Sequence, residues 1–147
     1  MRARAWLVCV LSAPALCAAS SLEKTIPVPR KGETRLGWSG NGCSVKSVSL
    51  QNYPSREDID KARRSDPSDN SWVWWNFHVE NRGQSKCKIQ LWVDIYGKNG
   101  QVVKSGDRSD TVDAGKLDDN IRVSTRMRTL DIADAPKAHI RAEIGPK

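Results

Sequence analysis

The sequence contains none of the short motifs that identify common catalytic sites. It has no GxSxG nucleophile elbow, no HExxH zinc motif and no glycine-rich loop that cradles phosphates. It has only two histidines, His78 and His139, and no CxxC pair, so it offers little material for a zinc or copper site. An Asn-x-Ser/Thr sequon is also missing, which is compatible with a bacterial exported protein. We therefore expect no enzymatic activity, no cofactor and no bound metal.

Long hydrophobic runs are missing beyond the first 20 residues. Two arginines precede the apolar residues 5–16, and small residues follow at 17–19, which is the pattern of a secretory signal peptide. A bilayer needs about 20 apolar residues, so this run is too short to span one. A bacterial lipoprotein signal with Cys17 as the lipidated residue is the alternative, but that signal requires a small residue where this chain has Leu16. We expect residues 1–20 to be removed and the protein to be periplasmic or secreted, with no integral membrane segment left.

Cysteine is scarce in the rest of the chain. Loss of residues 1–20 would remove Cys9 and Cys17 and leave Cys43 and Cys87. An even pair in an exported chain most simply forms one disulfide. A reactive or metal-binding thiol pair is the alternative, but no CxxC spacing or neighbouring histidine supports it. We predict a structural disulfide between Cys43 and Cys87.

Removal of residues 1–20 leaves 127 of the 147 residues, enough for one domain. Without the two arginines of the signal peptide, 22 basic residues remain against 17 acidic ones, a formal charge of +5. Such a charge weakly favours acidic partners. No nucleic-acid-binding signature accompanies it, and export makes nucleic acid an unexpected partner.

What the sequence does contain is two segments in which apolar and polar residues alternate, residues 72–81 and 87–96. Alternation with a period of two gives a strand one buried and one solvated face, which is typical of an antiparallel β-sheet. We expect the apolar odd-numbered positions to face the core. They are Val73, Trp75, Phe77, Val79, Ile89, Leu91, Val93 and Ile95.

The segments before residue 72 are less regular. Residues 21–42 read as an extended N-terminal lead-in that contains a short strand over 33–39 and ends in a turn at residues 40–42. A strand follows over 43–52, and its alternation changes parity near Ser47, which predicts a β-bulge. In the insertion over 53–71, Ser55 and Asp58 have the spacing of a helix capping box. This insertion is expected to be a short surface helix or a loop.

After residue 96, Asn99-Gly100 predicts a hairpin turn of type I′ that leads into a strand over 101–105. An acidic loop follows, and then further strands over 120–130 and 138–144. The pattern favours an all-β fold: an immunoglobulin-like antiparallel β-sandwich of about seven strands, with a short helical insertion, over residues 43–147.

One stretch resembles a known family. His78-Val79-Glu80-Asn81, a polar link, residues 89–96 and then Gly97-x-x-Gly100-x-Val102-Val103 resemble the small immunoglobulin-like sandwiches of the FxLYD and late-embryogenesis-abundant type. The likeness covers residues 72–144 and departs at Gly97, where the family usually has aspartate. It implies an exported, non-catalytic binding or accessory domain. It also implies that the strands before Asn81 and after Cys87 lie in opposite sheets, whereas the sequence alone equally permits a simple hairpin across residues 82–86.

Large aromatic side chains fall on the outward faces of the two main strands. They are Trp72, Trp74, Trp92 and Tyr96, with His78 on the same face as the first two. Exposed aromatics bind sugars, peptides and proteins because they bury much area at little entropic cost. Alternatively, residues 21–39, including Trp38, or the 53–71 insertion fold over them. If the two strands lie in opposite sheets, the candidate platform reduces to Trp72 and Trp74.

Two groups of charged residues are further candidates for a site. Arg122, Arg126 and Arg128 alternate along one strand face, with Lys116 and Arg108 as candidate neighbours, and such a stripe can hold an anionic partner. More commonly, such a stripe is a solvated face or an edge strand kept from pairing by its charges. A second group is acidic, but its spacing is not that of an EF-hand, so we expect no calcium site. Its members are Asp107, Asp110, Asp113, Asp118 and Asp119.

These observations predict an exported, non-enzymatic β-sandwich that contacts an envelope protein or a cell-wall glycan through its outward aromatic residues. One alternative is a structural subunit that joins an envelope assembly by edge-strand pairing. Another is a periplasmic inhibitor or immunity protein. Nothing in the sequence identifies the ligand.

Overall fold

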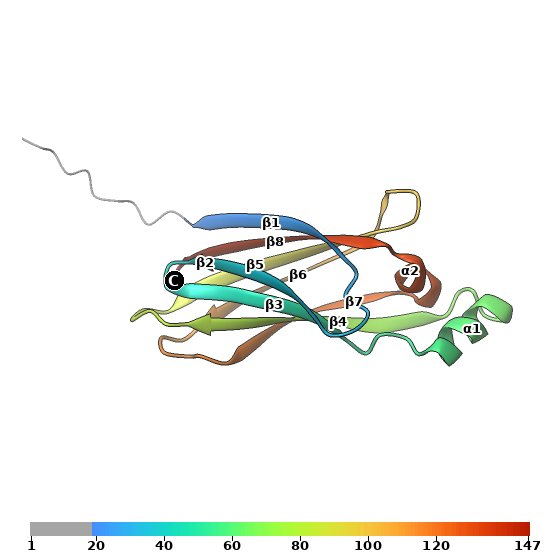
Figure 1. Cartoon of the computed structure of the whole chain (residues 1–147), viewed down its shortest axis with the longest axis horizontal. Helices are drawn as coiled ribbons and strands as arrows, with labels where there is room; N and C mark the ends of the chain where they lie inside the picture. The colour runs from blue at the N-terminus through green and yellow to red at the C-terminus, as the bar shows by residue number, and fades with distance from the viewer. Residues whose placement is uncertain (1–18) are drawn as a thin grey trace, which may run out of the picture.

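The computed structural model describes residues 19–147, so the expected signal peptide, with Cys9 and Cys17, lies almost wholly outside the described residues. Within residues 19–147, two antiparallel four-stranded sheets pack face to face (Figure 1). No helix in this part of the chain is long and apolar enough to cross a membrane. The first sheet, called sheet A, has the order β1 (Ser20–Pro27), β8 (Lys137–Pro146), β5 (Cys87–Tyr96) and β6 (Val102–Val112). Sheet B has the order β2 (Glu33–Gly40), β3 (Cys43–Gln51), β4 (Asn70–Asn81) and β7 (Asp119–Arg128). The predicted β-sandwich is confirmed.

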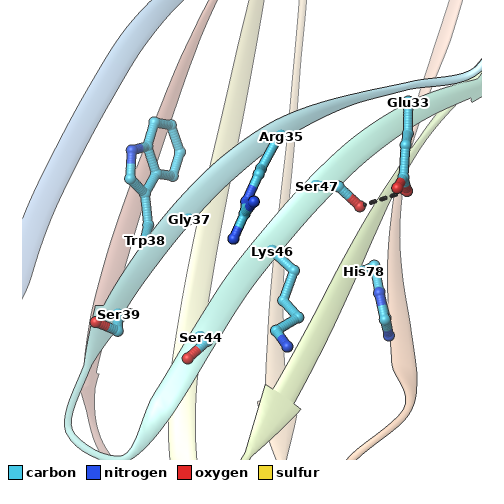
Figure 2. Close-up of a pocket in the computed structure, with 9 residues that line it drawn as sticks. All are labelled: Glu33, Arg35, Gly37, Trp38, Ser39, Ser44, Lys46, Ser47 and His78. Atoms are coloured by element: carbon cyan, nitrogen blue, oxygen red, sulfur yellow. Dashed lines mark hydrogen bonds between the residues drawn. The ribbon is translucent and has the colours of Figure 1, made fainter.

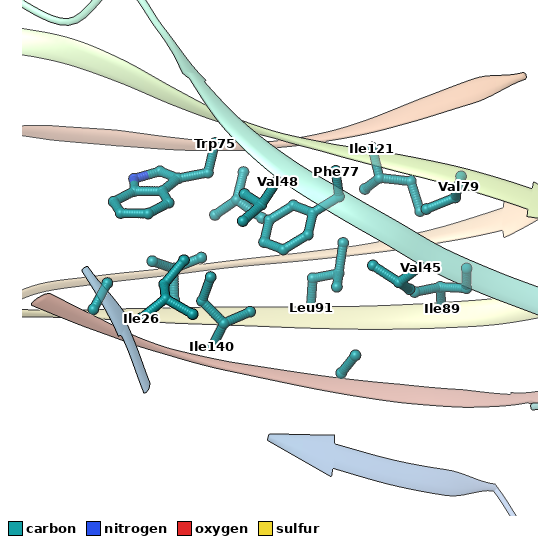
Figure 3. Packing of buried hydrophobic residues seen from close by; sticks show 14 of the residues in the cluster. Ile26, Val45, Val48, Trp75, Phe77, Val79, Ile89, Leu91, Ile121 and Ile140 are labelled. Carbon is teal, nitrogen blue, oxygen red and sulfur yellow. The ribbon is translucent and has the colours of Figure 1, made fainter. Parts of the chain in front are cut away.

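The core lies between the inner faces of the two sheets (Figure 3). Trp75 and Phe77 of β4 point toward Leu91 of β5 and Ile140 of β8 (Figure 3). All eight residues that the alternation of β4 and β5 placed inside are 0% exposed, which confirms that prediction. Because side chains alternate strictly along a strand, one correct parity assignment fixes the direction of every residue in it.

The strands β4 and β5 lie in opposite sheets, as the family resemblance implied, and do not form a simple hairpin. The predicted disulfide is present between Cys43 of β3 and Cys87 of β5, with a Cα–Cα distance of 6.5 Å. It therefore joins sheet B to sheet A. Both cysteines are fully buried, at the end of the sandwich where β4 ends and β5 begins.

The N-terminal segment is more than a lead-in. Residues 21–42 provide most of β1 and all of β2, which pair with β8 and β3, so the sandwich begins near residue 20 and not at Cys43. Sequence patterning missed β1 because only two of its eight residues, Leu22 and Ile26, are apolar side chains that pack on the core. The Asn41-Gly42 turn between β2 and β3 has positive φ at both residues, as expected.

The connection between β5 and β6 differs from the prediction. A type I′ turn at Asn99-Gly100 requires positive φ at both residues, but only Gly100 has it, with φ 77°. The Gly100 N–H instead donates to the Gly97 carbonyl at 3.0 Å, which closes the turn one residue earlier. Beyond the turn, β6 extends to Val112, so Asp107 and Asp110 lie in a strand and not in a loop. As an edge strand that is exposed along most of its length, β6 needs no apolar alternation, and this hid it from the pattern.

The insertion contains helix α1 (Arg56–Arg64), and the predicted capping box of Ser55 and Asp58 is present. The predicted bulge is also present, as a register shift between Val45 and Ser47. A second helix, α2 (Thr129–Asp134), corrects the prediction of a strand over 120–130, which ends at Arg128. Figure 1 shows α1 and α2 at the same end of the sandwich.

Candidate functional site

The outward aromatic residues occupy two separate surfaces. Trp72 and Trp74 lie on the outer face of sheet B, whereas Trp92 and Tyr96 lie on the outer face of sheet A. The core of the sandwich separates these two faces. The four side chains therefore form no common platform.

Most of these rings are covered by cations from the neighbouring strand. The Arg122 guanidinium lies 4.4 Å from the ring centroid of Trp74, and the Arg141 guanidinium 4.1 Å from that of Trp92. Such cation–π contacts stabilise by about 0.5–1 kcal/mol at exposed sites. Lys137 lies over Tyr96 at 5.7 Å. The N-terminal strands do not cover Trp74, because residues 20–27 and 33–40 are incorporated into the two sheets as β1 and β2, and Trp38 belongs to the core.

Trp72 differs from the other three rings, because 51% of its surface is exposed. It forms one wall of a hollow of about 320 Å³ between β4 and the start of α1. We call this the Trp72 hollow. The other lining residues are mostly polar and come from the first turn of α1 and from the segments on both sides of this helix: Asn52, Tyr53, Pro54, Asp58, Asp69, Asn70 and Ser71.

Local backbone contacts hold the Trp72 hollow in shape. Asn52 has a left-handed backbone with φ 58°, a conformation that asparagine tolerates better than most residues. Its side-chain amide donates to the Trp72 carbonyl at 2.6 Å, which ties the end of β3 to β4. Asp69 accepts a hydrogen bond from the Thr129 hydroxyl at 2.6 Å, which ties the other side of the hollow to α2.

The arginine stripe lies on β7, an edge strand of sheet B, and its members differ in their surroundings. Arg122 donates to the side chains of Asn76 and Gln51 at 3.2 and 3.3 Å. Arg128 forms two hydrogen bonds with Asp131, at 3.0 and 2.9 Å, and this carboxylate raises the pKa of Arg128. Arg126 has no hydrogen bond or ion pair within residues 19–147, and it pairs in register with Trp72. Arg126 is therefore the member of the stripe available to a ligand at Trp72.

The two candidate neighbours of the stripe lie in different places. Arg108 of β6 lines the same shallow hollow as Arg122, so these two are brought together. Lys116 lies near the end of β4, where its carbonyl accepts a hydrogen bond from the Asn81 N–H.

A larger hollow of about 440 Å³ lies elsewhere on the outer face of sheet B (Figure 2). We call it the β2–β4 hollow, because residues of these three neighbouring strands line it. Its charged members are Glu33 and Arg35 of β2 and Lys46 of β3. The remaining lining residues are Gly37, Trp38, Ser39, Ser44, Ser47 and His78.

Beside this hollow, Glu80 is held by two cations. Lys46 Nζ lies 3.2 Å from Glu80 Oε1, and Arg82 donates to both carboxylate oxygens at 3.0 and 3.4 Å. The hydrogen bond from Arg82, followed by that from Lys46, lowers the pKa of Glu80 below its ordinary value of 4.5, although partial burial opposes this shift. The ionised carboxylate is therefore favoured in the folded state.

This shift predicts a stability difference at acid pH. Because the folded pKa of Glu80 is lowered, its contribution is present above the unfolded value near 4.5 and is lost as the pH falls through the folded pKa. We expect Glu80→Gln to be less stable than wild type at pH 7, with the gap closing below pH 4.5. Urea unfolding from pH 3 to 7 measures this, with Glu143→Gln as the control. A gap that stays constant over that range would contradict the assignment.

His78 lines the β2–β4 hollow as well. Its Nε2 atom lies 3.1 Å from Asp118 Oδ1, but it is enclosed and makes no well-aligned hydrogen bond within residues 19–147. We take the pair as a weak contact, because the Asp118 side chain is 87% exposed. His139 lies on the opposite sheet and contacts Thr25 and Glu23.

The five aspartates considered as calcium ligands are dispersed. Asp107 accepts a hydrogen bond from Gln90, Asp113 pairs with Lys86, and Asp118 lies beside His78. In the part of the chain that the structure describes, no three or more His, Cys, Asp or Glu side chains gather as a metal-ligand set.

Sequence reasoning found Trp72 but missed both hollows. The Trp72 hollow forms because pairing of β3 with β4 brings Asn52 beside Trp72, which lies 20 positions away in the sequence. The β2–β4 hollow depends on how β2 pairs with β3, whereas the sequence predicts only a short strand over 33–39 within the lead-in and no partner for it. The parity change near Ser47 was the one visible signal, since Lys46 and Ser47 line that hollow.

Comparisons with known proteins do not identify the chain. No protein-family model matches it, and no curated protein matches it. Among solved structures, the enzymatically active domain of tailspike protein 4 from bacteriophage CBA120 aligns with 86% of this chain at 6% identity and a TM-score of 0.24. The aligned part spans 17% of that tailspike chain. A likeness at this level carries no argument about fold or function.

Proposed function

We propose that this protein is an exported, non-enzymatic binding module that recognises a cell-envelope glycan in the Trp72 hollow. One observation carries the proposal: Trp72 is 51% exposed and forms a wall of a hollow whose other lining is mostly polar. A ligand site commonly combines an apolar or aromatic wall with a few hydrogen-bonding groups that fix orientation. The disulfide supports export, because such bonds persist in oxidising compartments.

The chemistry of the Trp72 hollow suits a pyranose ring. The flat indole of Trp72 can cover the apolar C–H face of a sugar, while asparagine and aspartate side chains bind its hydroxyl groups. The Asn70 side chain donates to the Ser68 carbonyl at 2.8 Å, which leaves its oxygen as an acceptor. Arg126 lies in register with Trp72 and adds a cation for an acidic substituent. The hollow therefore favours a glycan, and most of all one with acidic groups.

Replacing Trp72 with alanine tests this proposal. We expect retention on isolated peptidoglycan sacculi to weaken at least about tenfold, because an aromatic anchor commonly supplies 2 kcal/mol or more of binding free energy. Thermal stability should stay within about 1 kcal/mol of wild type, since half of the ring is already in solvent. Cosedimentation and calorimetric melting measure the two quantities.

The matched control is Trp92→Ala, which removes a tryptophan from the outer face of the opposite sheet. This variant should bind sacculi as the wild type does. Equal retention by wild type and Trp72→Ala would contradict the proposal. So would equal losses in both tryptophan variants.

A second candidate function, strand pairing within an envelope assembly, is favoured by the open edge of β1. β1 pairs with β8 over all eight residues without a register shift, and its other edge has no strand partner within residues 19–147. The edge strands β6 and β7 are less open to a partner than β1, because they lie against each other: Gly106 of β6 contacts Val123 and Thr125 of β7. A regular open edge can accept a strand from a partner protein.

Proline substitution separates the two candidates. Successive N–H groups of a strand point in opposite directions, so of Glu23→Pro and Lys24→Pro one removes an outward donor and leaves the pairing with β8 intact. Under strand pairing, that variant should melt like wild type but be absent from complexes in gentle envelope extracts. If a complex persists with the folded variant, edge pairing is contradicted.

A further inference from the structure

We infer that the β2–β4 hollow is a second binding site, for a small carboxylate that carries a hydroxyl or ammonium group beside the acid. The hollow shares no lining residue with the Trp72 hollow. The inference therefore goes beyond the proposed glycan site and does not depend on it.

Two backbone irregularities build this hollow at the same level of sheet B. In β2, two residues lie between Arg35 and Trp38 where β3 has one, so β2 has one extra residue here, and Gly37 in this segment has φ +66°. In β3, Lys46 is extra relative to β4. Bulges of this kind redirect side chains and interrupt regular pairing. The backbone therefore sets where the hollow lies in sheet B.

The bulge in β3 brings two polar side chains together. Val45 and Val48 are both fully buried in the core. The two residues between them, Lys46 and Ser47, therefore both lie on the outer face, where regular alternation would turn one of them inward. This places an ammonium and a hydroxyl side by side in the hollow (Figure 2).

Cationic donors are available in the hollow. Arg35 is exposed and has no hydrogen bond or ion pair to any residue in 19–147, so its five N–H donors are free to bind a ligand. Lys46 contacts Glu80, but that carboxylate is also bound by Arg82 and does not depend on Lys46 alone. Figure 2 shows Arg35 and Lys46 extending from neighbouring strands into the hollow. Together they suit a carboxylate, which accepts charge-assisted hydrogen bonds.

Glu33 supplies an acceptor for the hydroxyl or ammonium group of the ligand. One oxygen of its carboxylate accepts a hydrogen bond from the Ser47 hydroxyl at 2.8 Å, and the other has no partner within residues 19–147. In Figure 2 this pair lies at the end of the hollow opposite Ser39 and Ser44. A free carboxylate oxygen accepts from a hydroxyl or ammonium group and repels a second anion. Acetate and phosphate therefore suit the hollow less well than a hydroxy- or amino-carboxylate.

The size of the hollow agrees with this class of ligand. A volume of about 440 Å³ falls in the range of small-molecule sites and accommodates a sugar acid or an amino acid. Such a group could be a free metabolite or the end of an envelope peptide or glycan. Both sources present the same carboxylate with a neighbouring donor.

Titration of the ¹⁵N-labelled protein with glucuronate, D-alanine, glucose and acetate tests the inference by NMR. We expect glucuronate and D-alanine to shift the amide resonances of Arg35, Lys46 and Ser47, with glucose and acetate binding at least about tenfold more weakly. Glucose binding as tightly as glucuronate would overturn the inference, as would the absence of shifts at these residues.

Variants separate recognition from folding. Arg35→Gln should weaken glucuronate binding about tenfold while leaving the melting temperature unchanged, because Arg35 has no partner to lose within residues 19–147. Arg64→Gln, at the last residue of α1, is the control and should bind as wild type does. Trp72→Ala should show the same glucuronate-induced shifts at Arg35, Lys46 and Ser47 as the wild type, which distinguishes this site from the glycan site. Unchanged binding by Arg35→Gln would overturn the inference.

Competition distinguishes the two sources of ligand. A soluble peptidoglycan fragment should displace glucuronate more effectively than monomeric D-alanine if the site holds the end of an envelope polymer. Displacement at lower concentration by the monomer would support a free metabolite. Displacement by neither would overturn the inference.

Discussion

Replacing Cys43 and Cys87 together with alanine should lower the free energy of unfolding by about 4 kcal/mol. The bond closes a loop with a sequence separation of 44, for which the chain-entropy model gives that value. For a domain of this size, such a loss corresponds to a fall in melting temperature of about 12–20 °C. The effect should be large because this disulfide restricts the conformations of the unfolded chain over the long segment between Cys43 and Cys87. In the folded protein it joins the two sheets.

Reduced wild-type protein is the matched control for the double variant. It keeps both sulfur atoms in the core, so the difference between the two reports the packing loss at these buried positions alone. Denaturant unfolding of the oxidised, reduced and double-alanine forms measures all three. If the oxidised and reduced forms agree within about 1 kcal/mol, the disulfide does not stabilise the fold as the loop length predicts.

Asn81→Asp should destabilise the protein by about 3 kcal/mol or more at pH 7. Asn81 is 0% exposed, and its side-chain amide donates to the carbonyls of Ser85 and Val112 at 2.8 and 3.0 Å. Its oxygen accepts from the Gly83 N–H at 2.9 Å. Aspartate has nearly the same shape but lacks both donors, and its charged oxygen would face two carbonyl oxygens. This one-atom change therefore removes the two hydrogen bonds that Asn81 donates to Ser85 in the following loop and to Val112 at the end of β6.

The pH dependence of this variant gives a second readout. Burial and the two carbonyl oxygens should raise the pKa of the new carboxyl group. Its protonated form can still donate one hydrogen bond, so the deficit relative to wild type should be smallest at pH 3 and should grow as the pH rises above the ordinary aspartate value of about 3.9.

The matched control is Asn76→Asp on the same strand. Its side-chain oxygen accepts from Arg122 at 3.2 Å, so a carboxylate there keeps its partner. Chemical denaturation of both variants at pH 3 and pH 7 checks these expectations. Equal stability of the two variants at pH 7 would contradict the role assigned to Asn81.

Asn81 also shows how far a sequence motif reaches. The Val79-x-Asn81 pattern contributed to the resemblance to FxLYD-type sandwiches, and Val79 faces the core as its parity requires. The role of the asparagine is visible only in three dimensions. Its partners lie in two separate segments: Gly83 and Ser85 in the loop after β4, and Val112 at the end of β6.

The candidate sites were predictable only in part. The exposed Trp72 followed from the parity of β4, and the division of the aromatics followed once β4 and β5 were placed in opposite sheets. The ring of Trp74 could not be judged from sequence, because its cover, Arg122, comes from a strand almost 50 residues later. The β2–β4 hollow depends on two coincident bulges, of which one left a trace in the sequence, near Ser47.

The sequence by itself determined the β-sandwich class, the eight core positions of the two main strands, the α1 capping box and the cysteine pair. The first three depend on local periodicity or on short fixed spacings. The cysteine pair follows because only two cysteines remain after residue 20, so only one intramolecular disulfide can form. Only the tertiary structure decided that β1 belongs to sheet A, that β6 continues through an acidic segment, and that Asn52 and Arg126 lie beside Trp72. These features depend on which strands pair and in which register. Register is set by the whole packed core, so no window of the sequence contains it.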